Sequence, residues 1–255
     1  MDAIVLHPSL LSVYLDNCFR IDVECCYVLQ MLISRRVAFE EIGFPCNNLV
    51  LNGCAQLPDY IATNPPLKEH LLQKNQLDDD DAIRIAEALS MNTNLRTLNV
   101  NENHITCIGY DAIRKALFDT TNFNSVTASN HTCWIYYDDN IMDCPHNNGY
   151  HDGSQEDPKT NLATKIYSVL SSRNKAGTNA RTLDLELGEE CLSLVPKILE
   201  VVHKASSLGY RQHYLIWEPK NCGMSKDEAM KPLSIVYELV RSWKMPSLFE
   251  YHYRG

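Results

Sequence analysis

The chain has 255 residues, of which 45% are hydrophobic and 22% charged, a balance typical of folded globular proteins rather than disordered chains. Its formal net charge is −9 and no basic cluster offsets it locally, so we expect neither nucleic acid nor an anionic membrane surface as a partner. No apolar run approaches the roughly 18 residues of a membrane-spanning helix, and the apolar patch at the N-terminus lacks the basic region that precedes a signal peptide. The ten cysteines have no framework spacing, which favours reduced thiols and an intracellular, cytoplasmic location.

Residues 1–38 are predicted to form an N-terminal cap or a degenerate repeat unit. A weak apolar pattern starts near Leu10 or Leu11, and residues 27–33 have the apolar spacing of a helix. Cys25 and Cys26 belong to the same helix. Adjacent cysteines rarely meet disulfide geometry, so we expect both thiols in the core.

Residues 39–134 contain a repeated unit of 28 residues. Each unit follows the pattern LxxLxLxxNxL, in which the letters mark apolar residues and an asparagine, and the four units begin at Phe39, Leu67, Leu95 and Phe123. The asparagines are Asn47, Asn75, Asn103 and, one place early, Asn130. The LxL stretch predicts a short parallel strand with inward apolar side chains, and the asparagine amide is expected to satisfy backbone groups where the chain turns. Residues 82–89 and 112–117 have helical spacing, so a helix is predicted after each strand.

Four consecutive aspartates, residues 78–81, stand at the start of one of these helices. Carboxylates there cap free N–H groups and favour the positive end of the helix dipole. A divalent-cation site is the alternative, but oxygen-rich calcium loops contain an intervening glycine that is absent here. The sequence therefore favours helix capping.

A 28-residue unit of LxxLxLxxN followed by a helix resembles the ribonuclease-inhibitor-like subclass of leucine-rich repeats. The resemblance implies an α/β fold, a short horseshoe with parallel strands inside and helices outside. The sequence departs from the pattern at His70, which replaces a core leucine, and at the prolines of the first unit, which predict a short helix near Pro58. Residues 129–133 and 237–246 are also similar to a group of uncharacterised repeat proteins predicted in microalgae, a likeness that implies no mechanism.

The sequence changes character after the repeats. Residues 135–159 are polar and rich in turn formers, which predicts a loop or insertion. Residues 160–255 are predicted to form a helical C-terminal cap, with helices near residues 162–170, 194–202 and 232–243. Residues 182–187 alternate like a strand, so either a degenerate extra repeat strand or a loop is expected there.

Two cysteines and two histidines are the sharpest candidates for a metal site: His131, Cys133, Cys144 and His146. Four such ligands can hold a tetrahedral zinc ion. Paired zinc ligands are usually separated by two or more residues, whereas one residue separates His131 from Cys133. A buried structural cysteine with surface histidines is therefore preferred, and we expect no cofactor.

The predicted function is protein binding without catalysis, because no phosphate loop, nucleophile elbow or metalloprotease motif is present. The outward strand positions on the concave side form the expected binding surface, suited to a hydrogen-bonding or mildly basic protein partner. By the repeat register they are Glu41, Gly43, Pro45, Glu69, Leu71, Gln73, Thr97, Asn99, Asn101, Ser125, Thr127 and Ser129. A zinc-binding structural role is one alternative. Another is implied by the resemblance alone, because some proteins of this subclass regulate a GTPase as its partner.

Overall fold

The computed structural model describes residues 9–35, 38–51, 56–136 and 158–175, together with residues 4, 7 and 200. The chain divides into two compact units. The first comprises Met1–Asp119 and Ala128–Asp157, and the second comprises Thr120–Thr127 and Pro158–Gly255. No helix in the described part of the chain is long and apolar enough to cross a membrane.

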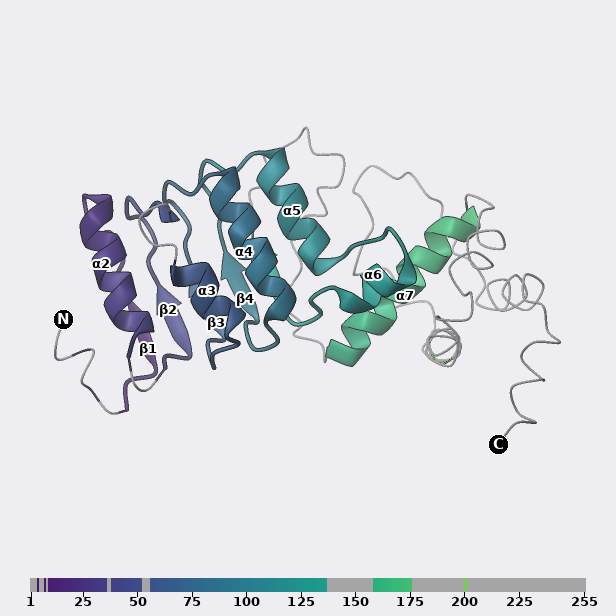
Figure 1. The fold of residues 1–255 in the computed structure, drawn as a ribbon, viewed down its shortest axis with the longest axis horizontal. Helices are drawn as coiled ribbons and strands as arrows, with labels where there is room; N and C mark the ends of the chain where they lie inside the picture. Colours follow the sequence, from purple (N-terminus) through teal and green to yellow (C-terminus); the bar gives the residue numbers. More distant parts are fainter. Residues whose placement is uncertain are drawn as a thin grey trace. The chain divides into compact units, whose positions relative to one another are not determined.

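The first unit is an α/β structure built on five parallel strands that pair in chain order. The strands are β1 (Ser12–Tyr14), β2 (Glu41–Gly43), β3 (Glu69–Leu71), β4 (Thr97–Asn99) and β5 (Trp134–Tyr136). The helices of this unit are α2 (Asp22–Ile33), α3 (Gln56–Ala62), α4 (Asp79–Met91) and α5 (Cys107–Leu117). Figure 1 shows β1 to β4 side by side with α2 to α5 along one face of the sheet.

The strand register confirms the predicted spacing for β2 to β4. Glu41 of β2 pairs with Glu69 of β3, which pairs with Thr97 of β4, so the partners are 28 residues apart. The weak pattern near Leu10 corresponds to β1, whose Ser12 pairs with Glu41. The helix after each strand brings the chain back to the end of the sheet where the next strand begins, as a parallel connection requires.

The fourth predicted strand is wrong. Residues 123–128 form helix α6 (Phe123–Ala128), and Thr97 pairs instead with Trp134, 37 positions later. Ser125 and Thr127 are therefore helical and Ser129 follows the helix, so none of the three belongs to the sheet. The physical reason lies in Asn122, whose side-chain Oδ1 accepts from the Ser125 N–H at 2.8 Å and caps the helix start.

The core of the first unit lies between the sheet and its helices. Inward strand residues Val13, Ile42 and Leu98 are buried together with helix residues such as Leu29 and Ile85. Cys25 and Cys26 are also buried, as predicted. Helix α3 is seven residues long, and Pro58 lies in its first turn, where a missing N–H leaves no broken bond.

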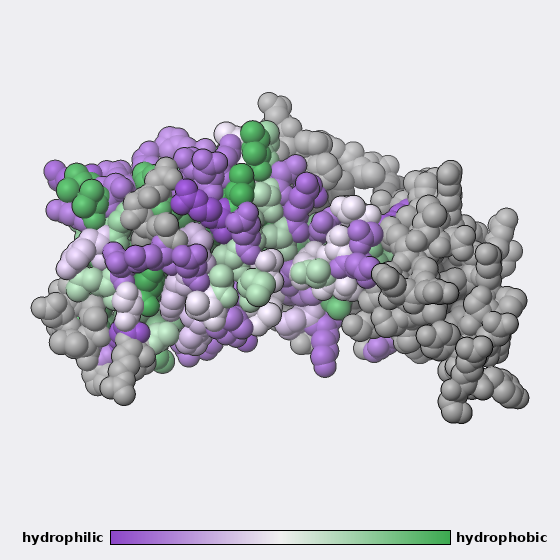
Figure 2. All heavy atoms as spheres, viewed as in Figure 1, coloured by the Kyte–Doolittle hydropathy of each residue, from purple (hydrophilic) through white to green (hydrophobic). Residues whose placement is uncertain are grey.

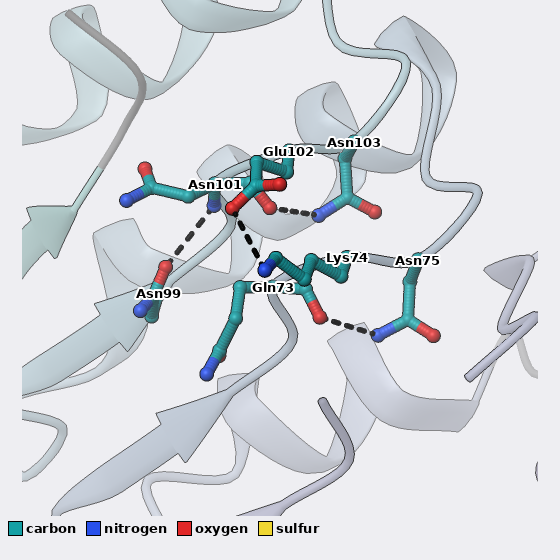
Figure 3. Close-up of polar contacts among 7 residues, drawn as sticks. All are labelled: Gln73, Lys74, Asn75, Asn99, Asn101, Glu102 and Asn103. Carbon is teal, nitrogen blue, oxygen red and sulfur yellow. Dashed lines mark hydrogen bonds and ion pairs between the residues drawn. The ribbon is translucent and has the colours of Figure 1, made fainter. Parts of the chain in front are cut away.

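Asparagine side chains join successive turns at the ends of the strands. The Asn75 Nδ2 donates to the carbonyls of Phe44 and Leu72 at 2.8 and 3.0 Å, and its Oδ1 accepts from the Leu49 N–H at 3.1 Å. Asn47 and Asn103 make equivalent contacts one turn earlier and one turn later. The predicted role of these amides is confirmed, and Figure 3 shows Asn75 and Asn103 at matching places in consecutive turns.

The residue before each of these asparagines adopts the left-handed conformation. Their φ angles are 55° at Cys46, 59° at Lys74 and 52° at Glu102, and Asn17 has the same conformation in the first turn. This backbone region is unfavourable for side chains other than glycine, asparagine and aspartate. The cysteine, lysine and glutamate at these positions did not predict this backbone conformation.

A second set of asparagines holds the opposite corners, where helices lead into strands. The Asn92 Nδ2 donates to the Ile61 carbonyl at 2.8 Å, and its Oδ1 accepts from the Leu95 N–H at 2.7 Å. Asn130 occupies the equivalent place before β5, since its Oδ1 accepts from the Cys133 N–H at 2.8 Å. Asn130 was expected at a turn after a strand, and that expectation is wrong.

The aspartate run caps the start of α4, as predicted, and one of its members also caps α5, which was not predicted. Asp78 and Asp81 form a capping box at the start of α4. Asp79 accepts from the Thr106 N–H at 2.7 Å and the Gly109 N–H at 3.0 Å, and so satisfies the start of α5. Burial works to raise the pKa of Asp79, but hydrogen bonds from Thr106 and Gly109 outweigh it and hold the pKa below its usual range. The cation alternative gains no support, because the described residues contain no group of three or more ligands that could hold a metal ion.

The described helices of the second unit are α6, apart from its last residue, and α7 (Pro158–Lys175). Ile166, Val169 and Leu170 are buried along one face of α7, as the spacing predicted. The Arg173 guanidinium lies over the Phe123 ring of α6 at 4.8 Å. Residues 135–136 belong to β5 and 158–159 to α7, whereas residues 137–157, the two later helices and the alternating segment 182–187 lie outside the described residues.

Candidate functional site: the open face of the sheet

Alternate side chains of a strand point to opposite faces of the sheet. The middle residues of the strands lie in the core, so the flanking residues face away from the helices. We call this surface the open face. Its members form two rows across the strands, Ser12, Glu41, Glu69, Thr97 and Trp134 in one and Tyr14, Gly43, Leu71, Asn99 and Tyr136 in the other.

The register brings six of the predicted binding residues together on the open face: Glu41, Gly43, Glu69, Leu71, Thr97 and Asn99. Thr97 is buried despite facing outward, so it offers little surface to a partner. Pro45, Gln73 and Asn101 come two positions after the ends of β2, β3 and β4.

Tyr14, Trp134 and Tyr136 were not among the predicted binding residues. The weak apolar pattern that starts at Leu10 could have identified Tyr14. Tyr14 lies four positions after Leu10, as the outward residue Gly43 lies four positions after Phe39. The alternation of Trp134, Ile135 and Tyr136 gave the signal for β5. Tyr14 lies on β1, and Trp134 and Tyr136 lie on β5, which are the two edge strands of the sheet.

A tyrosine and two glutamates form the most structured part of the open face. Glu41 and Glu69 are direct partners on neighbouring strands. The Tyr14 hydroxyl donates to Glu41 Oε2 at 2.6 Å and lies 3.4 Å from Glu69 Oε2. Like charges directly opposite each other on neighbouring strands are destabilising, and a single hydroxyl proton only partly offsets this.

Gly43 makes this arrangement possible. A Cβ atom built on Gly43 would lie 2.4 Å from Cδ1 of Tyr14, well inside van der Waals contact. The tyrosine ring therefore crosses the strand at the one place that has no side chain, and its hydroxyl reaches the glutamates beyond. The ring itself stays accessible, with 48% of Tyr14 exposed.

The hydrogen bond to Glu41 raises the pKa of Tyr14 above its ordinary value, and burial and the charges of Glu41 and Glu69 act in the same direction. The same bond lowers the pKa of Glu41, with a further contribution from the Ser12 hydroxyl. Tyr14 therefore stays protonated and Glu41 stays ionised at neutral pH. The cluster is a fixed negative charge beside an aromatic ring.

The centre of the open face is neutral and rich in amides. Asn99 Oδ1 accepts from the Asn101 N–H at 3.1 Å, as Figure 3 shows. Gln73 Oε1 and Asn101 Oδ1 are shielded from solvent and have no hydrogen-bond partner among the described residues. Leu71 lies beside them as a half-buried apolar residue.

Basic side chains lie only around this surface. Lys68 Nζ pairs with Glu40 at 2.6 Å, and Lys74 Nζ pairs with Glu102 at 3.4 Å, both in exposed positions. The two rows of the open face contain no lysine or arginine. The open face is therefore acidic near β2 and β3, neutral at its centre and aromatic on β1 and β5.

The candidate metal ligands are only partly described. His131 and Cys133 precede β5, and Cys133 is buried. Cys144 and His146 lie outside the described residues, so the four-ligand site stays a prediction.

Comparison with known proteins gives no family. No protein-family model and no curated protein matches the sequence. Among solved structures, the chain is similar to Leiomodin-1 actin-binding site 2, with a TM-score of 0.31 and 16% sequence identity over 80% of this chain and 94% of that chain. A likeness at this TM-score carries no argument about fold or function.

Proposed function

We propose that the chain is a leucine-rich-repeat protein of the ribonuclease-inhibitor-like kind, and that it binds a partner protein on the open face without catalysis. The observation that carries this proposal is the open face itself, where Tyr14, Glu41, Leu71 and Tyr136 share one surface of a parallel sheet. The first unit provides the scaffold, and the partner would contact the strands directly.

The repeat assignment is supported by how each turn depends on its neighbour. Strand partners recur every 28 residues from β2 to β4, and Asn75 reaches back to the carbonyl of Phe44 in the preceding turn. A single turn of this kind cannot bury its own apolar face, so stacking completes the core. This dependence is the property expected of a solenoid.

Binding on the open face is supported by the kind of side chains that it presents. Tyrosine and tryptophan offer a large contact area at low entropic cost, and they are enriched among residues that dominate binding energy. Tyr14 and Tyr136 are 48% and 37% exposed although both belong to strands. Viewed from the helix side, Figure 2 shows mainly hydrophilic residues with separate apolar patches, a surface typical of contact with solvent.

Site-specific photo-crosslinking tests this proposal. Benzoylphenylalanine replaces Tyr136 on the open face, Leu71 at its centre or, as the control, Tyr27, which is 62% exposed on α2. The Tyr136 and Leu71 variants should crosslink the same protein in cells, and the Tyr27 variant should not. Crosslinks at Tyr27 alone, or none at the two open-face positions, would contradict the proposal.

A further inference from the structure

We propose that the open face receives an arginine side chain of the partner polypeptide, held against the carboxylates of Glu41 and Glu69 and the ring of Tyr14. This inference rests on the proposed function, since it names the chemistry of the partner. It starts from the strand register, which makes the two glutamates direct partners on adjacent strands. Adjacent strands are only about 4.8 Å apart, so the two carboxylates repel each other in the free protein.

The two carboxylates differ in how well the protein satisfies them. Glu41 accepts hydrogen bonds from the hydroxyls of Tyr14 and Ser12. Among the described residues, Glu69 has only the Tyr14 hydroxyl, at 3.4 Å. Both donors are neutral, and no ion pair in the described residues includes either glutamate, because Lys68 pairs with Glu40 and acts on Glu41 only through its charge. The pair therefore has acceptor capacity and negative charge that the described residues match only in part.

The surroundings favour a guanidinium over a small ion. The Tyr14 ring crosses Gly43 and stays 48% exposed beside the carboxylates. A guanidinium can donate to two carboxylates while its flat face lies on an aromatic ring, whereas an ammonium group offers a point charge. A bound metal ion would need a larger ligand group than the described residues provide. Half-buried Leu71 follows Glu69 by two positions and can contact an apolar residue beside the arginine.

The repulsion between the two carboxylates should lower the stability of the free protein, and this loss can be measured without a ligand. Glu69→Gln removes the charge repulsion but keeps the shape of the side chain, so the free protein should become more stable. Binding of an arginine should weaken in the same variant by roughly fivefold, as expected for loss of one accessible ion pair. Glu102→Gln, which removes an equal charge outside the open face, is the matched control. It should not change arginine binding.

The probe is a set of immobilised random nonapeptide pools whose central residue is fixed as arginine, lysine, glutamine or glutamate. The purified full chain should be retained most by the arginine pool and next by the lysine pool, with retention that falls as salt is added. Glu69→Gln together with Glu41→Gln should reduce retention to that of the glutamine pool, while circular dichroism shows a folded chain. Equal retention of all pools, or arginine retention that the double variant keeps, would overturn the inference.

The two proposals fail in different ways. If the Tyr136 and Leu71 crosslinks identify a partner but the arginine pool shows no preference, the open face binds by other chemistry and only this inference is overturned. If the crosslinks are absent as well, the proposed function fails too. A selective arginine pool whose retention Glu102→Gln abolishes would move the basic site away from the open face and also overturn this inference.

Discussion

Replacing the buried His70 by leucine should change how the protein responds to acid. His70 stands at the inward position of β3, where Ile42 and Leu98 occupy the neighbouring strands, and it is fully buried. Its Nδ1 lies 2.8 Å from the Ile42 carbonyl, which fixes the proton on that nitrogen, and its Nε2 has no partner in the described residues. Burial lowers the pKa of His70 from its ordinary value of 6.5 to about 4, although the Ile42 carbonyl opposes this.

The sign and size of the effect follow from that pKa. Between pH 6.5 and pH 4 the unfolded chain binds a proton at His70 and the folded chain does not. As the pH falls through this window, the free energy of unfolding therefore decreases by about 1.4 kcal/mol per pH unit, and by about 3 kcal/mol over the whole window. Above pH 6.5 the histidine is neutral in both states and contributes no pH dependence.

Urea unfolding of the wild type and of His70→Leu, from pH 7 down to about pH 4.5, measures this difference. Near pH 7 the two free energies of unfolding should agree within about 1 kcal/mol, because a lost hydrogen bond to Ile42 is offset by apolar burial. As the pH falls the variant should become the more stable, by about 2 kcal/mol or more at pH 4.5. Leu98→Val, in the matching position of β4, cannot titrate and should keep the wild-type slope. Parallel curves for the wild type and His70→Leu would refute the reasoning.

Three further predictions concern neighbouring features. Gly43→Ala should displace the Tyr14 ring and lower the pKa of Tyr14 toward about 10, measured by ultraviolet titration against Tyr14→Phe; an unchanged titration would show that the ring does not depend on Gly43. Lys74→Gly should stabilise the fold by roughly 0.5–1 kcal/mol in thermal unfolding because φ is 59° there, and Lys74→Ala, which loses the same ion pair but keeps the strain, should not. Asn75→Ala should destabilise by roughly 2 kcal/mol because the Phe44 carbonyl and the Leu49 N–H lose the side chain that pairs with them, although the Leu72 carbonyl keeps its bond from Asn103. The substitution Gln76→Ala at the exposed neighbouring position should cost less than about 0.5 kcal/mol.

The sequence predicted β2 to β4 because two independent signals coincide in each unit. An apolar LxL stretch marks the strand, and an asparagine at a fixed distance marks the turn, as Asn75 does after β3. The start of α4 was predictable for a similar reason, since Asp78 and Asp81 have a local capping role. Local chemistry thus sufficed wherever the unit keeps its length.

The fourth unit was misplaced because its pattern fits two structures. Phe123 and Val126 stand three residues apart, which is both the LxxL spacing of a repeat and the spacing of one face of a helix. The choice depends on Asn122 as a cap and on Asn130, which bonds the Leu89 carbonyl 41 residues earlier. A contact of that range is not encoded in any local window.

The same limit explains what was missed on the open face. Glu41, Glu69 and Leu71 follow from the register of the regular units. Tyr136 does not, because its place depends on where β5 pairs. The contact of Tyr14 with Glu41 could not be predicted from the register either. The tyrosine ring crosses a strand over Gly43, and no repeat pattern relates Tyr14 to Glu41.

The asparagines at the strand ends also give the chain a direction of assembly. Asn47, Asn75 and Asn103 each bind backbone groups of the turn before their own, through bonds that reach back 26 to 32 residues. Nothing that these amides need lies ahead of them in the sequence. When the chain is synthesised from its N-terminus, the preceding turn is therefore already present when each new turn forms. Its carbonyl and N–H groups are available to the asparagine of the new turn. Each turn can close onto the preceding turn as soon as its own asparagine has been added, well before synthesis is complete.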